Sequence, residues 1–231
     1  MSNLLIEDRN IVTPGEEIAT GMDYLPSHGT YRDGESIVAK QSGLLKVEGK
    51  VLRIVPLSGE YLPKRGDTVI AQVEDVTMSS WIVSMFGPYS AMLGLKEGTQ
   101  EFVRKGEDLT KYYAVGDYIV CKIVNVTSQK LVDVSTRGPG LRKLNEGRIF
   151  RVSSSKVPRI IGKQGSMVSL VKDHTKTQIT VGQNGMVWIK GEEFALENLA
   201  EKAIKKIEAE AHTSGLTDTM ESWLKEQVGG Q

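Results

Sequence analysis

The chain has 231 residues, of which 25% are charged and 39% are hydrophobic, and this length favours one large domain or two to three small ones. No apolar run approaches the roughly 20 residues that span a bilayer, and the N-terminus lacks the sections of a signal peptide. Because the single Cys121 cannot form an internal disulfide, we expect a cytoplasmic protein in which this thiol is a small buried apolar group.

The formal net charge of zero hides an uneven distribution of charge along the chain. Residues 138–191 contain ten Lys and Arg against two Asp and Glu, whereas residues 1–63 and 192–231 are acidic. One interpretation is a solvated basic face that the acidic segments balance. We favour the other, a binding surface for a polyanion, because the local excess is large over a segment with the pattern of a folded domain.

Residues 1–63 carry short apolar alternations separated by glycines and other turn residues. This pattern predicts a small all-β domain, and it contains no cluster of catalytic residue types. The sequence PKRG at 63–66 is a plausible boundary to the next domain.

Residues 64–137 alternate with a period of two, so that Val69, Ala71 and Val73 share one face. Five such runs with one long connection, at about 94–116, predict a small five-stranded barrel of the OB type. Such barrels bind single-stranded nucleic acid by stacking bases on exposed aromatic rings. Trp81 and Phe86 fall on opposite faces of a regular strand, so only one can be a stacking platform. We expect Trp81 to be the exposed ring.

The run Gly138-Pro139-Gly140 can continue neither a helix nor a strand ladder, which predicts a linker at 138–147. Residues 148–231 then show a mixed pattern of strand, two helices, a hairpin and a long amphipathic helix, the order β-α-α-β-β-α. A tail helix capped by Thr217 or Asp218 is expected after it. The predicted fold class is multidomain, mainly β plus α+β.

The pattern Gly-x-x-Gly occurs twice in this last domain. GQNG at Gly182–Gly185 lies between two apolar runs and predicts a simple hairpin turn. GKQG at Gly162–Gly165 lies between two predicted helices, where glycine lets a sugar–phosphate backbone approach and the next helix offers free N–H groups. Lys163 adds a charge at the tip and Gln164 a neutral donor. We interpret this loop as the nucleic-acid clamp of a KH domain, with a tight helix–helix corner as the alternative.

Residues beside the predicted clamp complete this candidate site. Arg159 adds positive charge on the preceding helix. Apolar side chains are expected to floor a groove for bases, namely Ile160, Ile161, Val168, Ile179 and Val181.

The enzymatic alternatives find little support in the sequence. It has no phosphate-binding Gly-x-x-x-x-Gly-Lys-Ser/Thr motif, no His-Glu-x-x-His and no Cys-x-x-Cys. His28, His174 and His212 fall in three different segments, which disfavours a catalytic triad or a metal site. We therefore expect binding without catalysis, and neither metal nor cofactor.

In its domain order and motifs the chain resembles the S1/KH RNA-binding cap subunits of the archaeal exosome. The matching segments cover nearly the whole chain, and they are VTPGE (Val12–Glu16), GTY (Gly29–Tyr31), GDTVIAQVEDV (Gly66–Val76), TRGPGLRKL (Thr136–Leu144) and RIIGKQGSMVSLV (Arg159–Val171). The resemblance implies a trimeric cap on a hexameric ring of phosphorolytic ribonuclease subunits. It also implies that residues 1–63 dock on the ring, and that the cap recruits single-stranded, often A-rich RNA and guides its 3′ end inward.

The barrel departs from that family's pattern at two stacking positions. Met78 and Ser79 stand where a Phe-Gly pair is usual, and AMLGLKE has no counterpart of the usual His. Trp81 and Arg137 match the pattern better. Binding at the pore is therefore expected to rest more on charge, from Lys122 and Arg137, than on stacking.

Two other functions remain open from sequence. One is a free-standing translation or ribosome-associated RNA-binding factor, which would need no N-terminal docking domain. The other is a ribonuclease in its own right, since S1 and KH domains also follow the catalytic domains of polynucleotide phosphorylase. Large catalytic domains of that kind have no counterpart in this sequence.

Overall fold

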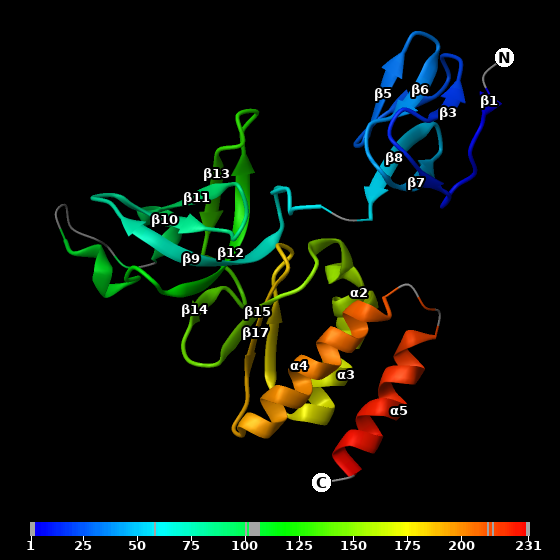
Figure 1. The fold of residues 1–231 in the computed structure, drawn as a ribbon. Coiled ribbons are helices and arrows are strands. Elements are labelled where there is room, and N and C mark those ends of the chain that lie inside the picture. Colours follow the sequence, from blue (N-terminus) through cyan, green and yellow to red (C-terminus); the bar gives the residue numbers. More distant parts are fainter. Residues whose placement is uncertain are drawn as a thin grey trace. The chain divides into compact units, whose positions relative to one another are not determined.

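The computed structural model describes residues 3–57, 59–99, 101, 107–211, 213 and 215–229 (Figure 1). The chain divides into two compact units, Met1–Gly59 and Glu60–Gln231. The second unit contains both a β-barrel and an α+β domain, which share buried contacts.

The first unit consists of two small sheets, as the alternating pattern predicts. One has the order β1-β3-β6-β5 and the other β2-β7-β8-β4. Their strands are β1 (Asn3–Leu4), β2 (Ile11–Val12), β3 (Glu17–Thr20), β4 (Leu25–Pro26), β5 (Thr30–Asp33), β6 (Ser36–Ala39), β7 (Gly43–Glu48) and β8 (Val51–Pro56). Ile18, Ile37 and Leu52 are fully buried between the sheets, so the all-β prediction is confirmed.

The barrel has the five predicted strands. They are β9 (Thr68–Val76), β10 (Ser80–Ser84), β11 (Ser90–Gly94), β12 (Tyr118–Val126) and β13 (Val132–Ser135). The barrel closes because β13 pairs with β11 in parallel and with β12 antiparallel. Val69, Ala71 and Val73 are buried on its inside, as their period-two spacing requires.

The long connection between β11 and β12 contains the short helices α1 (Leu95–Gly98) and η1 (Leu109–Lys111). Residues 100 and 102–106 of this connection lie outside the described residues. After the barrel, Gly138 and Gly140 have φ values of +145° and +79°, which lets the Gly-Pro-Gly run turn sharply. The chain then adds β14 (Arg142–Leu144) to the barrel beside β12, so part of the expected linker is a strand.

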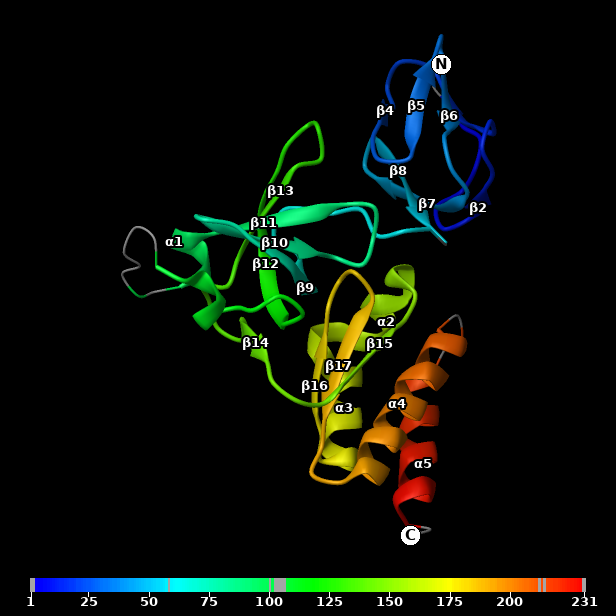
Figure 2. The same cartoon turned by 60° about the vertical axis from the view of Figure 1, so that its left-hand side comes forward.

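The α+β domain has the predicted β-α-α-β-β-α order. Its elements are β15 (Arg148–Arg151), η2 (Ser154–Lys156), α2 (Val157–Ile161), η3 (Lys163–Gly165), α3 (Ser166–Thr175), β16 (Gln178–Val181), β17 (Met186–Lys190), α4 (Phe194–Ala209) and α5 (Leu216–Gly229). The sheet order is β15-β17-β16, and the helices lie along one side of it, with α5 beside α4 (Figures 1 and 2). The tail helix begins at Leu216, so Thr217 and Asp218 lie in its first turn rather than at its cap.

The turn Gly182–Gly185 joins β16 to β17 as predicted, but it also fastens the α+β domain to the barrel (Figure 2). β10 ends at Ser84, so the first residues of β9 have no β10 partner. The side-chain amide of Asn184 bonds β9 there instead. Its Oδ1 accepts from the backbone N of Ile70 at 3.3 Å. Its Nδ2 donates to the carbonyls of Ile70 and Met85 at 2.8 and 2.9 Å. The turn therefore continues the hydrogen bonding of the barrel wall.

An apolar cluster surrounds this connection and buries side chains from both domains. The rings of Phe86 and Tyr118 stack at its edge with centroids 6.0 Å apart. Its buried members are Ile70, Val120, Leu144, Met186 and Trp188. Because a fully buried large apolar side chain contributes about 1.5–3 kcal/mol, this cluster holds the barrel and the α+β domain together as one unit.

Candidate nucleic-acid interface

The loop Gly162–Gly165 connects α2 to α3 and presents its two middle side chains to solvent. Lys163 and Gln164 are both exposed, and Gln164 has the left-handed φ of +54°. Gly162 (φ +76°) and Gly165 (φ +83°) also have positive φ, which glycine adopts without steric cost. The backbone is therefore bent so that a charged and an amide side chain stand at the tip.

The two glycines of this loop have different surroundings. A Cβ on Gly162 would lie 2.6 Å from the backbone N of Met167, so this position has no room for a side chain. A Cβ on Gly165 would meet no atom within 4 Å. Gly162 is thus required by packing, whereas Gly165 leaves open space in front of the helix.

Helix α3 begins directly after this loop, and no side chain caps its first turn. Helix N-termini carry unpaired N–H groups and the positive end of the helix dipole, which together attract anions. No acidic residue occupies the first turn of α3. The start of this helix is therefore suited to a phosphate group next to Lys163.

Ion pairing separates the ten basic residues of 138–191 into two groups. Four of them bond carboxylates, and these are Lys143 with Asp117, Arg148 with Glu201, Arg151 with Glu60, and Lys190 with Glu146. The other six form no ion pair within the part of the chain that the structure describes, and these are Arg142, Lys156, Arg159, Lys163, Lys172 and Lys176. Five of the six lie on or next to α2, the loop and α3. The positive charge left for a partner is thus concentrated around the loop.

An open groove of about 340 Å³ lies beside the loop. Four of the predicted floor residues line it, namely Ile161, Val168, Ile179 and Val181. Ile160 does not, and the prediction that it floors the groove was wrong. It is fully buried in the domain core, because consecutive residues of a helix point about 100° apart and Ile161 takes the groove side.

The prediction that Trp81 is an exposed stacking ring was also wrong. Trp81 is fully buried in the barrel, and its Nε1 donates to the carbonyl of Tyr113 at 3.1 Å. The ring of Tyr113 packs edge-on against it with centroids 5.3 Å apart, and Gly98 lies against its other edge. The connection between β11 and β12 folds over this tryptophan, which a strand pattern alone does not reveal.

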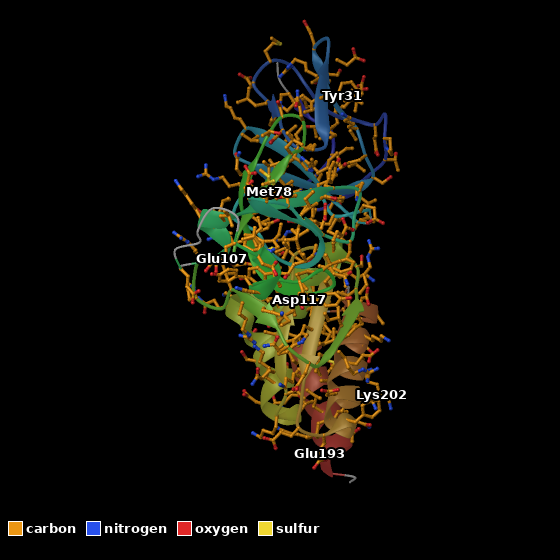
Figure 3. The ribbon with its side chains drawn as sticks, turned by 90° about the vertical axis from the view of Figure 1, so that its left-hand side faces the viewer. Tyr31, Met78, Glu107, Asp117, Glu193 and Lys202 are labelled. Carbon is orange, nitrogen blue, oxygen red and sulfur yellow. The ribbon has the colours of Figure 1, made fainter. Side chains whose placement is uncertain are left out.

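The two basic barrel residues predicted from the family pattern are both exposed. Lys122 lies on the outward face of β12. Arg137 follows β13 and donates from its guanidinium to the carbonyl of Thr99 at 2.9 Å. Met78, at the turn between β9 and β10, is 90% exposed and projects from the barrel (Figure 3). A methionine side chain is thus exposed at the position where the family pattern has an aromatic ring.

Comparisons with known proteins match this chain along its length. A family model described as "Exosome complex exonuclease RRP4 N-terminal region" matches residues 11–48, and one described as "KH domain" matches residues 147–193. The exosome complex component Rrp4 of Pyrococcus horikoshii is 40% identical over 97% of this chain and 85% of its own length. The chain belongs to the Rrp4 family.

Other relatives agree with this assignment to the Rrp4 family. The Rrp4 component of Picrophilus torridus is 40% identical over 97% of this chain and 96% of its own length. That of Methanobrevibacter smithii is 39% identical over 99% of this chain and 75% of its own. A crystal structure that bears the name of an exosome complex RNA-binding protein has a TM-score of 0.65 and 32% identity, and covers 73% of this chain and 97% of its own.

Two groups that sequence reasoning considered for other chemistry, Cys121 and His174, have ordinary structural environments. Burial raises the pKa of the Cys121 thiol to about 12, so it stays protonated and unreactive at neutral pH. The Nδ1 of His174 lies 2.9 Å from the carbonyl oxygen of Leu170 on α3, and His212 lies outside the described residues. Within the described ranges, no group of three or more His, Cys, Asp or Glu is arranged to hold a metal, and no helix is long and apolar enough to cross a membrane.

Sequence reasoning missed the roles of two residues, one at the junction between the domains and one in the groove. Asn184 was assigned to a simple turn, although an Asn preceding Gly185 in a hairpin gives no sign that its amide bonds another domain. Arg142 was counted only as part of a basic segment, yet it lies in the groove wall. Its position depends on the pairing of β14 with β12, which no local sequence pattern predicts.

Proposed function

We propose that this Rrp4-type chain is a non-catalytic RNA-binding subunit of an exosome, which holds single-stranded RNA for degradation by other subunits. The observation that carries the proposal is the exposed Lys163–Gln164 tip, which lies next to the uncapped start of α3 and near four further basic side chains that pair with no carboxylate among the described residues. A phosphate backbone fits these donors, and the neighbouring apolar groove offers a surface for bases. A cytoplasmic location is part of the proposal, and cell fractionation tests it.

The proposal extends to an assembly. Three copies form a cap on a hexameric ring of phosphorolytic exoribonuclease subunits, with the first 63 residues docked on the ring. The barrels line the entry, where Lys122 and Arg137 steer the RNA, and the KH domain recruits A-rich strands whose 3′ end enters the ring. The names of the relatives as exosome complex components and the match of residues 11–48 support this part of the proposal.

The first test uses the purified chain with end-labelled A-rich single-stranded RNA, with and without magnesium and phosphate. Each sample is run on a native and a denaturing gel. We expect a native shift with unchanged RNA length in every condition. Shortened RNA that is reproduced with independently purified protein and is reduced in a Lys163→Asp/Gln164→Asp preparation would instead indicate catalysis by the chain itself, whereas equal shortening by that variant would indicate a contaminating nuclease.

A second test separates a ring-bound subunit from a free-standing translation or ribosome factor. Residues 1–59 are deleted, since Tyr61 packs against the barrel and donates a hydrogen bond to Asp67 and so belongs with the second unit. We expect the shortened chain to keep its affinity for RNA and to lose co-migration with the phosphorolytic ring in gel filtration. If the intact chain also fails to associate with the ring, the cap assignment is wrong while RNA binding stands.

A further inference from the structure

The groove beside the clamp loop is built by three parts of the second unit. The KH domain supplies its floor from α2, α3 and β16, including Ile161 and Val168. The barrel supplies Thr68 of β9 and Val120 of β12. The chain between the two domains supplies the segment Pro139–Arg142. One end of the KH surface is therefore bordered by the barrel and the connecting segment.

The strand register places two cations beside this border. Val120 pairs with Arg142 of β14, and Lys122 pairs with Thr68 of β9. Residues directly opposite each other in antiparallel strands project to the same face, with Cβ atoms about 5 Å apart. Val120 and Lys122 share a face because they are two residues apart on β12. Arg142, Lys122 and the groove-lining Thr68 thus lie together on the outer face of the barrel.

The orientation of Arg142 is set by the fold. Its guanidinium lies over the ring of Trp188 with its Cζ 5.4 Å from the ring centroid. That ring is buried, and its Nε1 donates to the carbonyl of Glu146 at 2.8 Å, so it is a fixed support. Arg142 has no carboxylate partner among the described residues, and a guanidinium stacked on a ring keeps its in-plane N–H groups available. Arg142 is therefore an oriented donor with no carboxylate acceptor in the described part of the chain.

We propose that this composite groove is an RNA subsite that binds one nucleotide of a strand whose neighbouring phosphates are held at the Gly162–Gly165 loop. The base lies on Ile161 and Val168, and Arg142 binds the phosphate through two parallel N–H donors, with Lys172 as a second cation in the groove lining. The inference rests on the proposed RNA binding and adds that the barrel and the connecting segment form part of the KH binding site.

Three properties of the groove favour a nucleotide as its occupant. Its volume of about 340 Å³ is within the range of about 300–1,000 Å³ that is typical of small-ligand pockets. Its floor is apolar while two basic side chains, Arg142 and Lys172, line its walls, which suits a flat base carrying an anionic group. The groove-lining Ile161 directly precedes Gly162, so the groove begins next to the clamp loop.

The test compares RNA affinities of full-length variants by fluorescence anisotropy with an oligoadenylate at fixed salt. Arg142→Ala removes the oriented donor, and Arg151→Ala is its charge-matched control, because Arg151 is already paired with exposed Glu60. Thr68→Tyr fills the groove from the barrel side, and Ser90→Tyr adds the same ring at an exposed barrel position outside the groove. Thermal melting of each variant checks that it folds.

We expect Arg142→Ala and Thr68→Tyr each to weaken binding by about tenfold, since a charge-assisted bidentate contact is lost or blocked. Both controls should stay within about twofold of the parent, as surface changes away from a contact do. Arg142→Lys should recover part of the loss only, because it keeps the charge but not the planar pair of donors. The Arg142→Ala plot of log K against log salt should be shallower by about 0.7, the value for one phosphate contact on a single strand.

The outcomes separate this inference from the function on which it rests. Folded Arg142→Ala and Thr68→Tyr variants with parental affinity, beside a weakened Lys163→Asp/Gln164→Asp variant, would overturn the subsite and leave RNA binding by the loop in place. Parental affinity in all of these variants would overturn both. An independent readout is photocrosslinking with an RNA containing 8-azidoadenosine. Crosslinked peptides from the groove lining, Ile161–Val168 together with Pro139–Arg142, support the subsite, whereas crosslinks confined to segments outside the groove count against it.

Discussion

The two Gly-x-x-Gly turns of this chain have the same pattern and lie in the same domain, yet their middle residues differ in exposure and in the groups that they contact. Gly162–Gly165 exposes Lys163 and Gln164 to solvent. Gly182–Gly185 buries Asn184, which forms three hydrogen bonds with the barrel. The first turn is available to a ligand, and the second connects two domains.

The difference arises from what each turn connects. The first joins two helices, next to an uncapped helix start. The second joins two strands whose neighbour is an incompletely paired barrel strand, so its amide replaces a missing strand. A Gly-x-x-Gly pattern is therefore informative only together with the groups that its middle residues reach.

Among the substitutions that test this comparison, removal of the Asn184 amide should have the largest effect, which is on the free energy of unfolding. Asn184→Ala leaves the backbone groups of Ile70 and Met85 buried without partners, and we expect the free energy of unfolding to fall by about 3 kcal/mol. Urea unfolding followed by tryptophan fluorescence measures it, because all three tryptophans lie in the second unit. Gln183→Ala in the same turn is the control, and a loss there equal to that of Asn184→Ala would contradict the assigned role.

Two alanine substitutions at glycines with the same φ distinguish the cost of backbone strain from the cost of a steric clash. Gly165 and Gly185 both have φ of +83°, so an Ala at either position carries the same strain of about 1–2 kcal/mol. At Gly185 the new Cβ would also lie 2.3 Å from the carbonyl oxygen of Val152, whereas at Gly165 it meets nothing. We expect Gly185→Ala to destabilise the chain by at least about 2 kcal/mol more than Gly165→Ala in the same urea assay. Equal losses would mean that the close approach is relieved by movement.

Charge reversal at the exposed turn should affect binding but not folding. Lys163→Asp with Gln164→Asp places two carboxylates where phosphates are expected, and Asp tolerates the left-handed φ of position 164. We expect RNA affinity to fall at least about tenfold, or about 1.4 kcal/mol, with an unchanged melting temperature. Substituting Gly162 instead would confuse the result, because its Cβ has no room.

The control for this variant has the same composition elsewhere on the chain. Gln129 and Lys130 form the exposed turn between β12 and β13, and Lys130 also has a left-handed φ, of +64°. Gln129→Asp with Lys130→Asp therefore makes the same change in charge at a similar backbone conformation. A similar loss of affinity in both double variants would indicate a general electrostatic effect and remove the case for a specific clamp.

The smallest expected effect is on the salt dependence of RNA binding, which should differ between a lysine without an ion pair and an arginine that has one. Lys163→Ala should weaken RNA binding two- to threefold and reduce the slope of log K against log salt by about 0.7. Arg151→Ala should leave the slope unchanged, since its charge is already paired with Glu60. Binding isotherms at four or more salt concentrations measure both slopes, and identical slopes for the two variants would contradict the division of the basic residues.

Local sequence was sufficient for much of this molecule. Period-two alternation predicted the barrel strands, with Val69, Ala71 and Val73 inside, and the three-to-four spacing of apolar residues predicted α4 with its buried face. Glycine positions and local charge predicted a bent, basic loop at Gly162–Gly165. These features follow from sterics and periodicity over a few neighbouring residues, which a sequence contains in full.

Only the tertiary structure decided which side chains remain available. Trp81 is buried because residues of the connection 17 to 32 positions later in the chain fold over it, and Ile160 is buried because its helix turns that side to the core. Asn184 and Arg142 derive their roles from partners more than 40 residues distant, on β9 and β17. Exposure and pairing are properties of contacts between segments far apart in the chain, so no local pattern determines them.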